Sequence, residues 1–140
     1  MSVDFIDSNV VLYLFDETAA TKRKKAEALI RNAIETRSGI ISFQVVQETL
    51  NVLLHKIRRP AAAEDARRVL DSVLSPLWTV TPNVDQYRRA LDVRSRYKFS
   101  FFDALIVAAA LEARCARLLS EDLQHRQRIE GMIIVNPFAD

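Results

Sequence analysis

Four short segments of the sequence place a carboxylate where an expected strand gives way to an expected helix. The carboxylates are Asp7, Glu48, Asp103 and Asp122, within the segments FIDSN, QVVQE, SFFDA and LSED. In an open parallel α/β sheet such positions share one edge, the crevice beyond the carboxyl ends of the strands, where ligands bind. Residues far apart in the sequence could therefore form one acidic pocket. Because the segments contain no basic partner, we expect this pocket to hold a hard divalent cation with oxygen ligands.

The elements that must position these carboxylates alternate along the chain. Apolar segments predict strands over residues 3–6, 40–43, 77–80, 117–120 and 132–135. Helical spacing of apolar residues lies between these segments. Strands that alternate with helices predict βαβ units with right-handed crossovers. We therefore expect an α/β fold, a three-layer α/β/α domain with a mostly parallel five-stranded sheet, and a single domain over residues 1–140.

Several helix boundaries can be predicted from residue types. Ser8 and Asn9 offer capping side chains for a short helix through residues 10–15. Pro60 fits the start of another helix, because proline is favoured at the first helical position. The segment Phe101–Leu111 is apolar on nearly every side, which predicts a buried central helix.

Each carboxylate also has a local interpretation. Asp7 could simply end a strand, and Glu48 could lie on a solvated helix face. Asp103 could complete a capping box with Ser100. However, Asp103 lies between two phenylalanines and an apolar run, so we expect its side chain to be buried. An unpaired buried carboxylate would cost several kcal/mol, which a bound cation would offset.

Composition and charge narrow the class of protein. The chain is 49% hydrophobic and 27% charged, as in ordinary globular domains. Lone Cys115 excludes a disulfide framework and fits a reducing compartment. The longest apolar run, Ala104–Leu111, is far shorter than the ~20 residues of a membrane span, and no signal peptide pattern is visible. We expect a soluble, cytoplasmic protein that does not bind a membrane.

The net charge of +2 hides several basic clusters. They are Lys22–Lys25, Arg58–Arg59, Arg67–Arg68, Arg88–Arg89 and Arg94–Lys98. Such clusters are either solvated helix faces or a footprint for the phosphate backbone of a nucleic acid. Both interpretations stay open.

Taken together, the motifs resemble a known family. The matching segments are FIDSNVVLY at residues 5–13, Glu48, FDALIVAAA at 102–110, LSEDL at 119–123 and VNPF at 135–138. Over the whole chain, and in this order, they are similar to a PIN domain, and within that family to the VapC-type toxins of bacterial toxin–antitoxin pairs.

The resemblance implies a metal-dependent endoribonuclease that uses Mg²⁺ or Mn²⁺. Asp7 and Asp103 match the strongest metal ligands, and Asp122 and Glu48 match the other members of the acidic quartet, which bind the metal directly or through water. Asn9 and Ser120 match polar residues that orient the carboxylates or a water molecule.

The resemblance also implies partners: an RNA substrate, a cognate antitoxin and a second copy of the chain. Tyr97, Lys98 and Phe99 are candidates for the homodimer interface, although the aromatic pair fits a core equally well. Arg126 stands where similar toxins are expected to have glycine, so it either alters that loop, meets RNA phosphate or pairs with an acid. His125 and His55 lack a counterpart among the catalytic residues of the family.

Two alternatives come from other classes. A PIN fold that only binds partners would lack the acids, all of which are present here. A phosphoacceptor signalling domain would also build an acidic Mg²⁺ site on such a sheet. It would need an aspartate after the third strand and a lysine after the fifth, where the chain has Val80-Thr81-Pro82-Asn83 and Val135-Asn136-Pro137.

Overall fold

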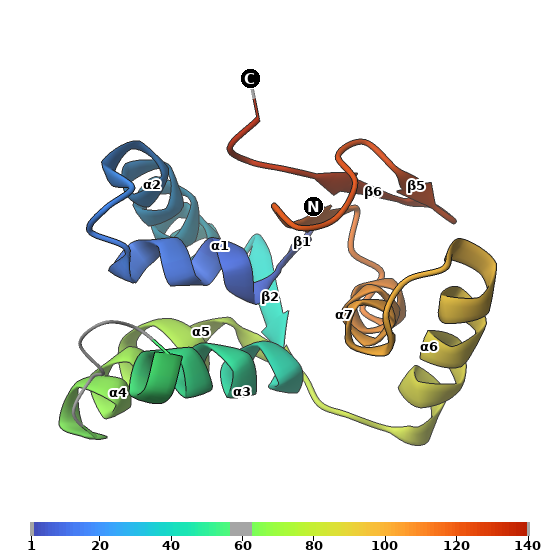
Figure 1. The fold of residues 1–140 in the computed structure, drawn as a ribbon, viewed down its shortest axis with the longest axis horizontal. Coiled ribbons are helices and arrows are strands. Elements are labelled where there is room, and N and C mark those ends of the chain that lie inside the picture. Colours follow the sequence, from blue (N-terminus) through green and yellow to red (C-terminus); the bar gives the residue numbers. More distant parts are fainter. Residues whose placement is uncertain (1, 57–62, 140) are drawn as a thin grey trace.

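The computed structural model describes residues 2–56 and 63–139, which form one six-stranded sheet with helices around it (Figure 1). The strands are β1 (Asp4–Ile6), β2 (Gly39–Ser42), β3 (Trp78–Val80), β4 (Arg117–Leu119), β5 (Arg128–Ile129) and β6 (Met132–Val135). The helices are α1 (Ser8–Leu12), α2 (Ala20–Thr36), α3 (Phe43–Asn51), α4 (Ala63–Val69), α5 (Ser75–Leu77), α6 (Val84–Tyr97) and α7 (Phe101–Glu112). Short irregular helices follow α1 (Tyr13–Phe15), α3 (Val52–Lys56) and α4 (Leu70–Leu74).

The sheet is covered on both faces, which explains its apolar strands. Figure 1 shows α1 and α2 on one side of the strands and α6 and α7 on the other. Phe5, Leu118 and Ile134, from three neighbouring strands, are fully buried. Near-continuous apolar strands are typical of parallel sheets that are covered on both faces. The three-layer α/β/α fold is thereby confirmed.

The predicted number of strands was wrong by one. The sheet has the order β3-β2-β1-β4-β6-β5, and all neighbours are parallel except β5 and β6. The additional strand, β5, has only two residues and no apolar run, so no pattern in the sequence marks it. It is held by antiparallel pairing with β6 across a tight turn, in which Glu130 has a positive φ of 54°.

Two predicted boundaries move by a residue or two. The cap of α1 is Asp7, whose side chain accepts a hydrogen bond from the Ser8 amide, whereas Ser8 and Asn9 lie within the helix. Phe43 begins α3 instead of ending β2. By contrast, α7 spans the predicted central helix and buries seven side chains. The helix start predicted at Pro60 and the cluster Arg58–Arg59 lie outside the described residues.

A close contact between α2 and β2 depends on glycine. A Cβ atom on Gly39 would lie 2.6 Å from the Cβ of Ala33 and 2.9 Å from Cδ1 of Ile6. Because real Cβ atoms do not approach so closely, only glycine lets this helix lie against the strand. The packing of α2 is therefore fixed at one end by a single small residue.

The strand order identifies the edge where a ligand would bind. From β1 the chain builds β2 and β3 on one side, then returns to build β4 and β6 on the other. Neighbouring strands β1 and β4 therefore form the switch point of the sheet, and the crevice at their carboxyl ends is the expected binding site. In the described part of the chain, no helix is long and apolar enough to span a membrane.

Candidate acidic site

Asp7 lies at the carboxyl end of β1, in the crevice beside β4. Its amide donates to the Leu119 carbonyl at 3.0 Å, which continues the pairing between the two strands. Its Oδ1 accepts a hydrogen bond from the Ser8 amide at 2.7 Å, and its Oδ2 accepts one from Ser120 Oγ at 2.8 Å. The side chain is buried, with only 7% of the residue exposed. Asp7 is thus a fixed carboxylate at the switch point.

Asn9 and Ser120 both donate hydrogen bonds to this carboxylate. Ser120 is fully buried. The Asn9 amide donates to Asp7 Oδ2 at 3.3 Å and to Ser120 Oγ at 3.1 Å. Its oxygen accepts from the Glu121 amide at 3.0 Å. One asparagine therefore connects the start of α1 to the loop after β4.

Glu48 joins the site from α3. It is half-buried, and its Oε1 accepts a hydrogen bond from Ser8 Oγ at 3.3 Å. Burial raises the pKa of Glu48, and the negative charges of Asp103 and Asp122 raise it further, against hydrogen bonds from Ser8 and Gln44 that lower it. The helix therefore turns this glutamate toward the other carboxylates and away from bulk solvent.

The environment of Asp7 disfavours its charged form. Burial raises the pKa of Asp7 to about 6, although hydrogen bonds from Ser120 and Ser8 lower it. The charges of Glu48 and Asp103 add to the rise. The pKa shifts of Asp7 and of half-buried Glu48 thus involve all four predicted carboxylates, and none of their causes is a lysine or arginine. A cation bound among them would relieve this repulsion.

The expectation that Asp103 is buried was wrong. Asp103 is partly exposed, and Phe102 beside it is 65% exposed. The first turn of α7 emerges from the domain, and continuous burial begins only at Ile106. Asp122 is exposed as well. The deeply buried carboxylate is Asp7, and the capping interaction at Ser100 is present, since Ser100 Oγ accepts from the Asp103 amide at 3.3 Å.

The donor set fits a hard divalent cation, but the carboxylates are not drawn together. Within residues 2–56 and 63–139, no three His, Cys, Asp or Glu side chains lie close enough to hold one ion. Mg²⁺ and Mn²⁺ prefer oxygen ligands such as these carboxylates, which no lysine or arginine neutralises in the described residues. Mg²⁺ usually keeps several waters and binds one or two carboxylates. Asp7 with Asp103 or Glu48 would supply those carboxylates.

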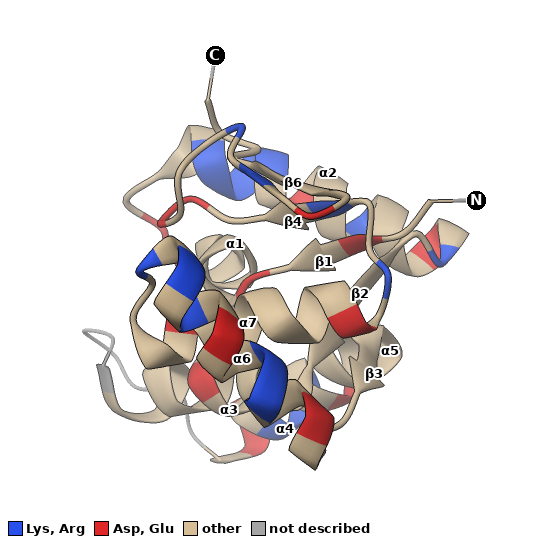
Figure 2. Cartoon of the chain, turned by 90° about the vertical axis from the view of Figure 1, so that its right-hand side faces the viewer, with Lys and Arg blue, Asp and Glu red and all other residues tan. Residues whose placement is uncertain are grey.

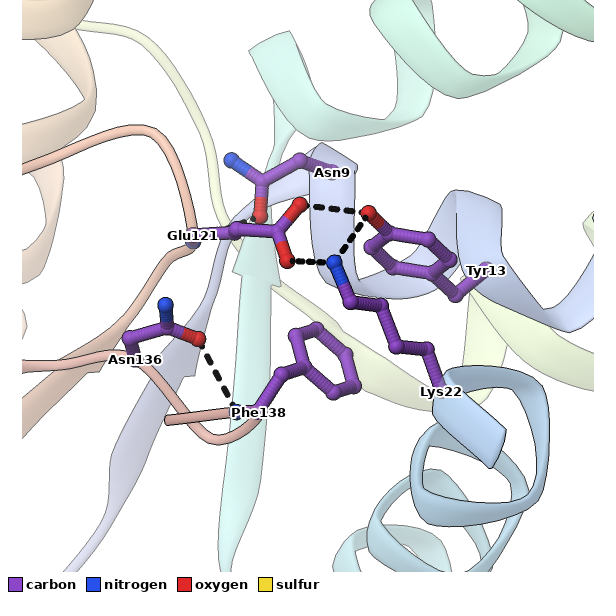
Figure 3. Close-up of polar contacts among 6 residues, drawn as sticks. All are labelled: Asn9, Tyr13, Lys22, Glu121, Asn136 and Phe138. Carbon is purple, nitrogen blue, oxygen red and sulfur yellow. Dashed lines mark hydrogen bonds and ion pairs between the residues drawn. The ribbon is translucent and has the colours of Figure 1, made fainter. Parts of the chain in front are cut away.

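A polar network beside the site was not predicted from the sequence (Figure 3). Glu121 accepts hydrogen bonds from Lys22 Nζ at 2.6 Å and from the Tyr13 hydroxyl. The Lys22 ammonium also lies 5.1 Å from the centre of the Tyr13 ring and 5.9 Å from that of Phe138. These contacts point Glu121 toward α2 and hold the loop that carries Asp122. We refer to Tyr13, Lys22, Glu121 and Phe138 as the loop clamp.

The loop clamp had only weak signals in the sequence. Lys22 belongs to a basic run of the kind usually found on solvated helix faces, and Glu121 directly precedes Asp122 without a motif of its own. At the far end of the clamp, the Phe138 amide donates to Asn136 Oδ1 at 2.9 Å. This turn brings Phe138 against Tyr13, in the short helix after α1, and against Lys22 of α2, which gives the VNPF segment a structural role.

The remaining candidates have structural roles as well. His125 accepts a hydrogen bond from the Asn136 amide at 2.9 Å, which fixes the loop after β4 to the end of β6. Arg126 has a φ of 71°, so the loop keeps the left-handed conformation that glycine favours, with arginine in its place. Tyr97 and Phe99 pack against the hydrophobic core.

Several basic clusters are paired with acids. On α6, Arg88 lies 3.0 Å from Asp85, and Arg89 contacts Glu112 at 3.0 Å and Glu130 at 2.8 Å. Figure 2 shows basic and acidic segments next to each other on this helix. The charges of Arg88 and Arg89 are therefore balanced locally, which favours a solvated face for this cluster.

The fold and the motifs agree with known proteins. Residues 5–129 match the sequence profile of the PIN domain. Similar solved structures include a toxin–antitoxin complex from Klebsiella pneumoniae, with a TM-score of 0.69 and 22% identity over 96% of this chain and 98% of that one. VapBC2 from Rickettsia felis bound to a promoter DNA fragment has a TM-score of 0.64 and 19% identity, covering 94% and 96%.

A third similar structure is VapC20 from Mycobacterium tuberculosis, a sarcin-ricin loop cleaving toxin. Its TM-score is 0.59 and its identity 20%, covering 82% of this chain and 86% of that one. No curated protein sequence matches the chain.

Proposed function

The chain belongs to the PIN domain family, and from that membership and its acidic site we propose that it is a metal-dependent endoribonuclease, the toxin of a toxin–antitoxin pair. The observation that carries the proposal is Asp7, a buried carboxylate at the switch point whose pKa is raised to about 6. Burial at this position disfavours the charged carboxylate, and a bound divalent cation would offset that cost.

The reaction proposed is hydrolysis of an RNA phosphodiester by in-line attack of water. Bound Mg²⁺ or Mn²⁺ would lower the pKa of that water and stabilise negative charge on the leaving oxygen. Asp7 and Asp103 would hold the ion, while Asn9 and Ser120 keep Asp7 in one orientation.

Glu48 or Asp122 would accept the proton of the attacking water. Burial raises the pKa of Glu48 toward neutral pH. A general base works best when its pKa lies near the pH of the reaction. The products would carry a 5′-phosphate and a 3′-hydroxyl, as expected for similar enzymes.

The proposed partners follow from the same family. An antitoxin would lay an amphipathic segment near the site, with a basic side chain toward the carboxylates. Complexes of a toxin with its antitoxin are among the similar structures. We further propose a homodimer, a single domain over the whole chain and a cytoplasmic location. If the antitoxin-free protein runs as a monomer at micromolar concentration, the homodimer is excluded.

The test uses purified, antitoxin-free protein on total cellular RNA with Mg²⁺ or Mn²⁺. EDTA and Asp103→Asn are the controls, and the ends of all fragments are sequenced. Discrete cuts with 5′-phosphates, lost in both controls, are the expected result and would name the RNA. Absence of cutting by folded, metal-loaded protein would refute the nuclease.

One observation favours a second candidate, a PIN fold that only binds. No three acidic or other ligating side chains in the described segments lie close enough to share an ion. Calorimetry with Mn²⁺ distinguishes the nuclease from the binding scaffold. The nuclease should show a heat of Mn²⁺ binding that is lost in Asp7→Asn and Asp103→Asn, and the scaffold should show no such heat.

A further inference from the structure

A cavity of about 200 Å³ opens beside the acidic site, where α3, α6 and α7 begin. Its aromatic walls are Phe43, Tyr87, Phe101 and Phe102, and its polar residues include Ser42 and Gln44. The cavity combines flat apolar walls with a few polar groups, which is typical of small-molecule and nucleotide sites.

Two lining residues, Gln44 and Phe102, connect the cavity to the acidic site. The Gln44 amide donates to the Phe102 carbonyl at 3.1 Å and lowers the pKa of Glu48, one helical turn along α3. Phe102 directly precedes Asp103. Two residues that line the cavity are therefore neighbours of Glu48 and Asp103, whose carboxylates lie outside its lining.

The aromatic walls are available to a flat ligand. Phe102 is 65% exposed and Tyr87 44% exposed, both high fractions for large apolar side chains. Tyr87 stacks on Phe101 at an interplanar angle of 13°, and Phe101 meets Phe102 edge to face at 5.5 Å. Exposed rings beside a nucleic-acid site offer surfaces on which bases stack.

Two oxygen atoms of cavity residues have no hydrogen-bond partner in the part of the chain that the structure describes. They are Ser42 Oγ and Gln44 Oε1, and both are buried. Ser42 is only 4% exposed and precedes α3 without capping it. A buried acceptor without a partner is costly, so a ligand that donates hydrogen bonds here would gain affinity.

We propose that this cavity binds the base of a nucleotide next to the scissile phosphate. The base stacks on Phe102, and its exocyclic amino group donates to Gln44 Oε1. The unpaired acceptor selects guanine, cytosine and adenine over bases without an amino group. The first turns of α3 and α7 lie at the same cavity, and the positive ends of their dipoles favour the nearby phosphates. The inference rests on the proposed ribonuclease function.

The first experiment measures binding without metal or cleavage. Nucleoside monophosphates are titrated into the protein in EDTA and followed by NMR. GMP should bind several-fold more tightly than IMP, which lacks only the amino group, and CMP more tightly than UMP. Phe102→Ala should weaken binding of all four roughly tenfold, as expected for a lost stacking contact. Leu91→Ala, which removes an exposed apolar side chain of α6 outside the cavity lining, should change nothing.

The second experiment maps cut sites in RNA with Mg²⁺ or Mn²⁺. Phe102→Ala and Gln44→Leu should relax the base preference beside the cut, and Leu91→Ala should preserve it. Nucleotide binding without any RNA cleavage would support the cavity and refute the proposed function. Cleavage with wild-type base preference and binding in Phe102→Ala would overturn the cavity. Dissociation of a dimer by Phe102→Ala, with base preference intact, would also overturn it and make this face an interface between copies.

Discussion

Ser120 donates a 2.8 Å hydrogen bond to Asp7 across the junction of β4 and β1, although the two residues are 113 positions apart. The hydroxyl also accepts from Asn9, which donates to Asp7 as well, so the side chains of Asp7, Asn9 and Ser120 are bonded to one another. The acidic site is therefore organised by the sheet itself, and its most buried carboxylate cannot turn away to solvent.

Asp7→Asn should raise the stability of the metal-free protein at neutral pH while abolishing metal-dependent cleavage. The folded pKa of Asp7 is about 6, above the ordinary aspartate value of 3.8. The stabilising protonated form is fully present below about pH 4 and is lost as the pH rises through 6. A shift of this size corresponds to about 3 kcal/mol.

Urea unfolding from pH 4 to pH 8 measures this effect. The wild type should lose stability between pH 4 and pH 7, and Asp7→Asn should lose much less. Asp92→Asn, an exposed aspartate on α6, is the matched control and should follow the wild type. Equal slopes for the wild type and Asp7→Asn would contradict the buried, uncompensated carboxylate.

Ser120→Ala should destabilise the fold by about 1–3 kcal/mol, because Asp7 and Asn9 would each lose a buried partner. Ser42→Ala is the matched control, since its buried hydroxyl has no partner among the described residues. Its removal should leave the free energy of unfolding nearly unchanged or raise it. If both variants lose equal stability, the hydrogen bond from Ser120 to Asp7 does not stabilise the fold more than an unpartnered hydroxyl does.

Lys22→Met should reduce cleavage and weaken Mn²⁺ binding, because it releases Glu121 and loosens the loop that carries Asp122. Lys25→Met removes an exposed charge from the same helix and serves as the control. Calorimetry with Mn²⁺ and initial cleavage rates measure the two effects. Equal losses in both variants would show that α2 acts only through its positive charge, without the loop clamp.

Gly39→Ala should destabilise the protein by about 1–3 kcal/mol, the usual range for overpacking. The new methyl group would meet Ala33 at 2.6 Å, and α2 would have to move. Gly131→Ala is the control, because nothing lies within 4 Å of its Cβ position. Thermal unfolding of both variants measures the difference, and a stable Gly39→Ala would show that α2 shifts freely.

The layers of the fold could be predicted because they depend on local patterns. Apolar runs mark β1, β4 and β6, and the continuous apolar surface of α7 marks a helix buried on most sides. By contrast, β5 exists only through its pairing with β6, and no residue pattern of its own indicates it.

The residues of the acidic site could be predicted from the sequence, but the exposure of their side chains could not. Asp7 and Ser120 follow strands, and the strand order brings them together. Asp103 was expected to be buried from its apolar neighbours in sequence, yet the first turn of α7 emerges from the domain. The loop clamp and the aromatic cavity depend on contacts between residues distant in the sequence, which composition and spacing do not reveal.

The arginine at position 126 adopts a backbone conformation that glycine would adopt without strain. Left-handed backbone costs a residue with a side chain roughly 1–2 kcal/mol. The surrounding hydrogen bonds, such as the 2.7 Å bond from the Arg126 amide to the Ile134 carbonyl, hold the loop in place despite this cost.

The strand order also has a consequence for synthesis of the chain on the ribosome. β4 lies between β1 and β6, and both β4 and β6 come after residue 116 in the sequence. A growing chain therefore carries Asp7 and Glu48 long before it has Ser120 or a completed sheet. Such a chain cannot form the hydrogen bond between Ser120 and Asp7, so the acidic site can be completed only after β4 has been made.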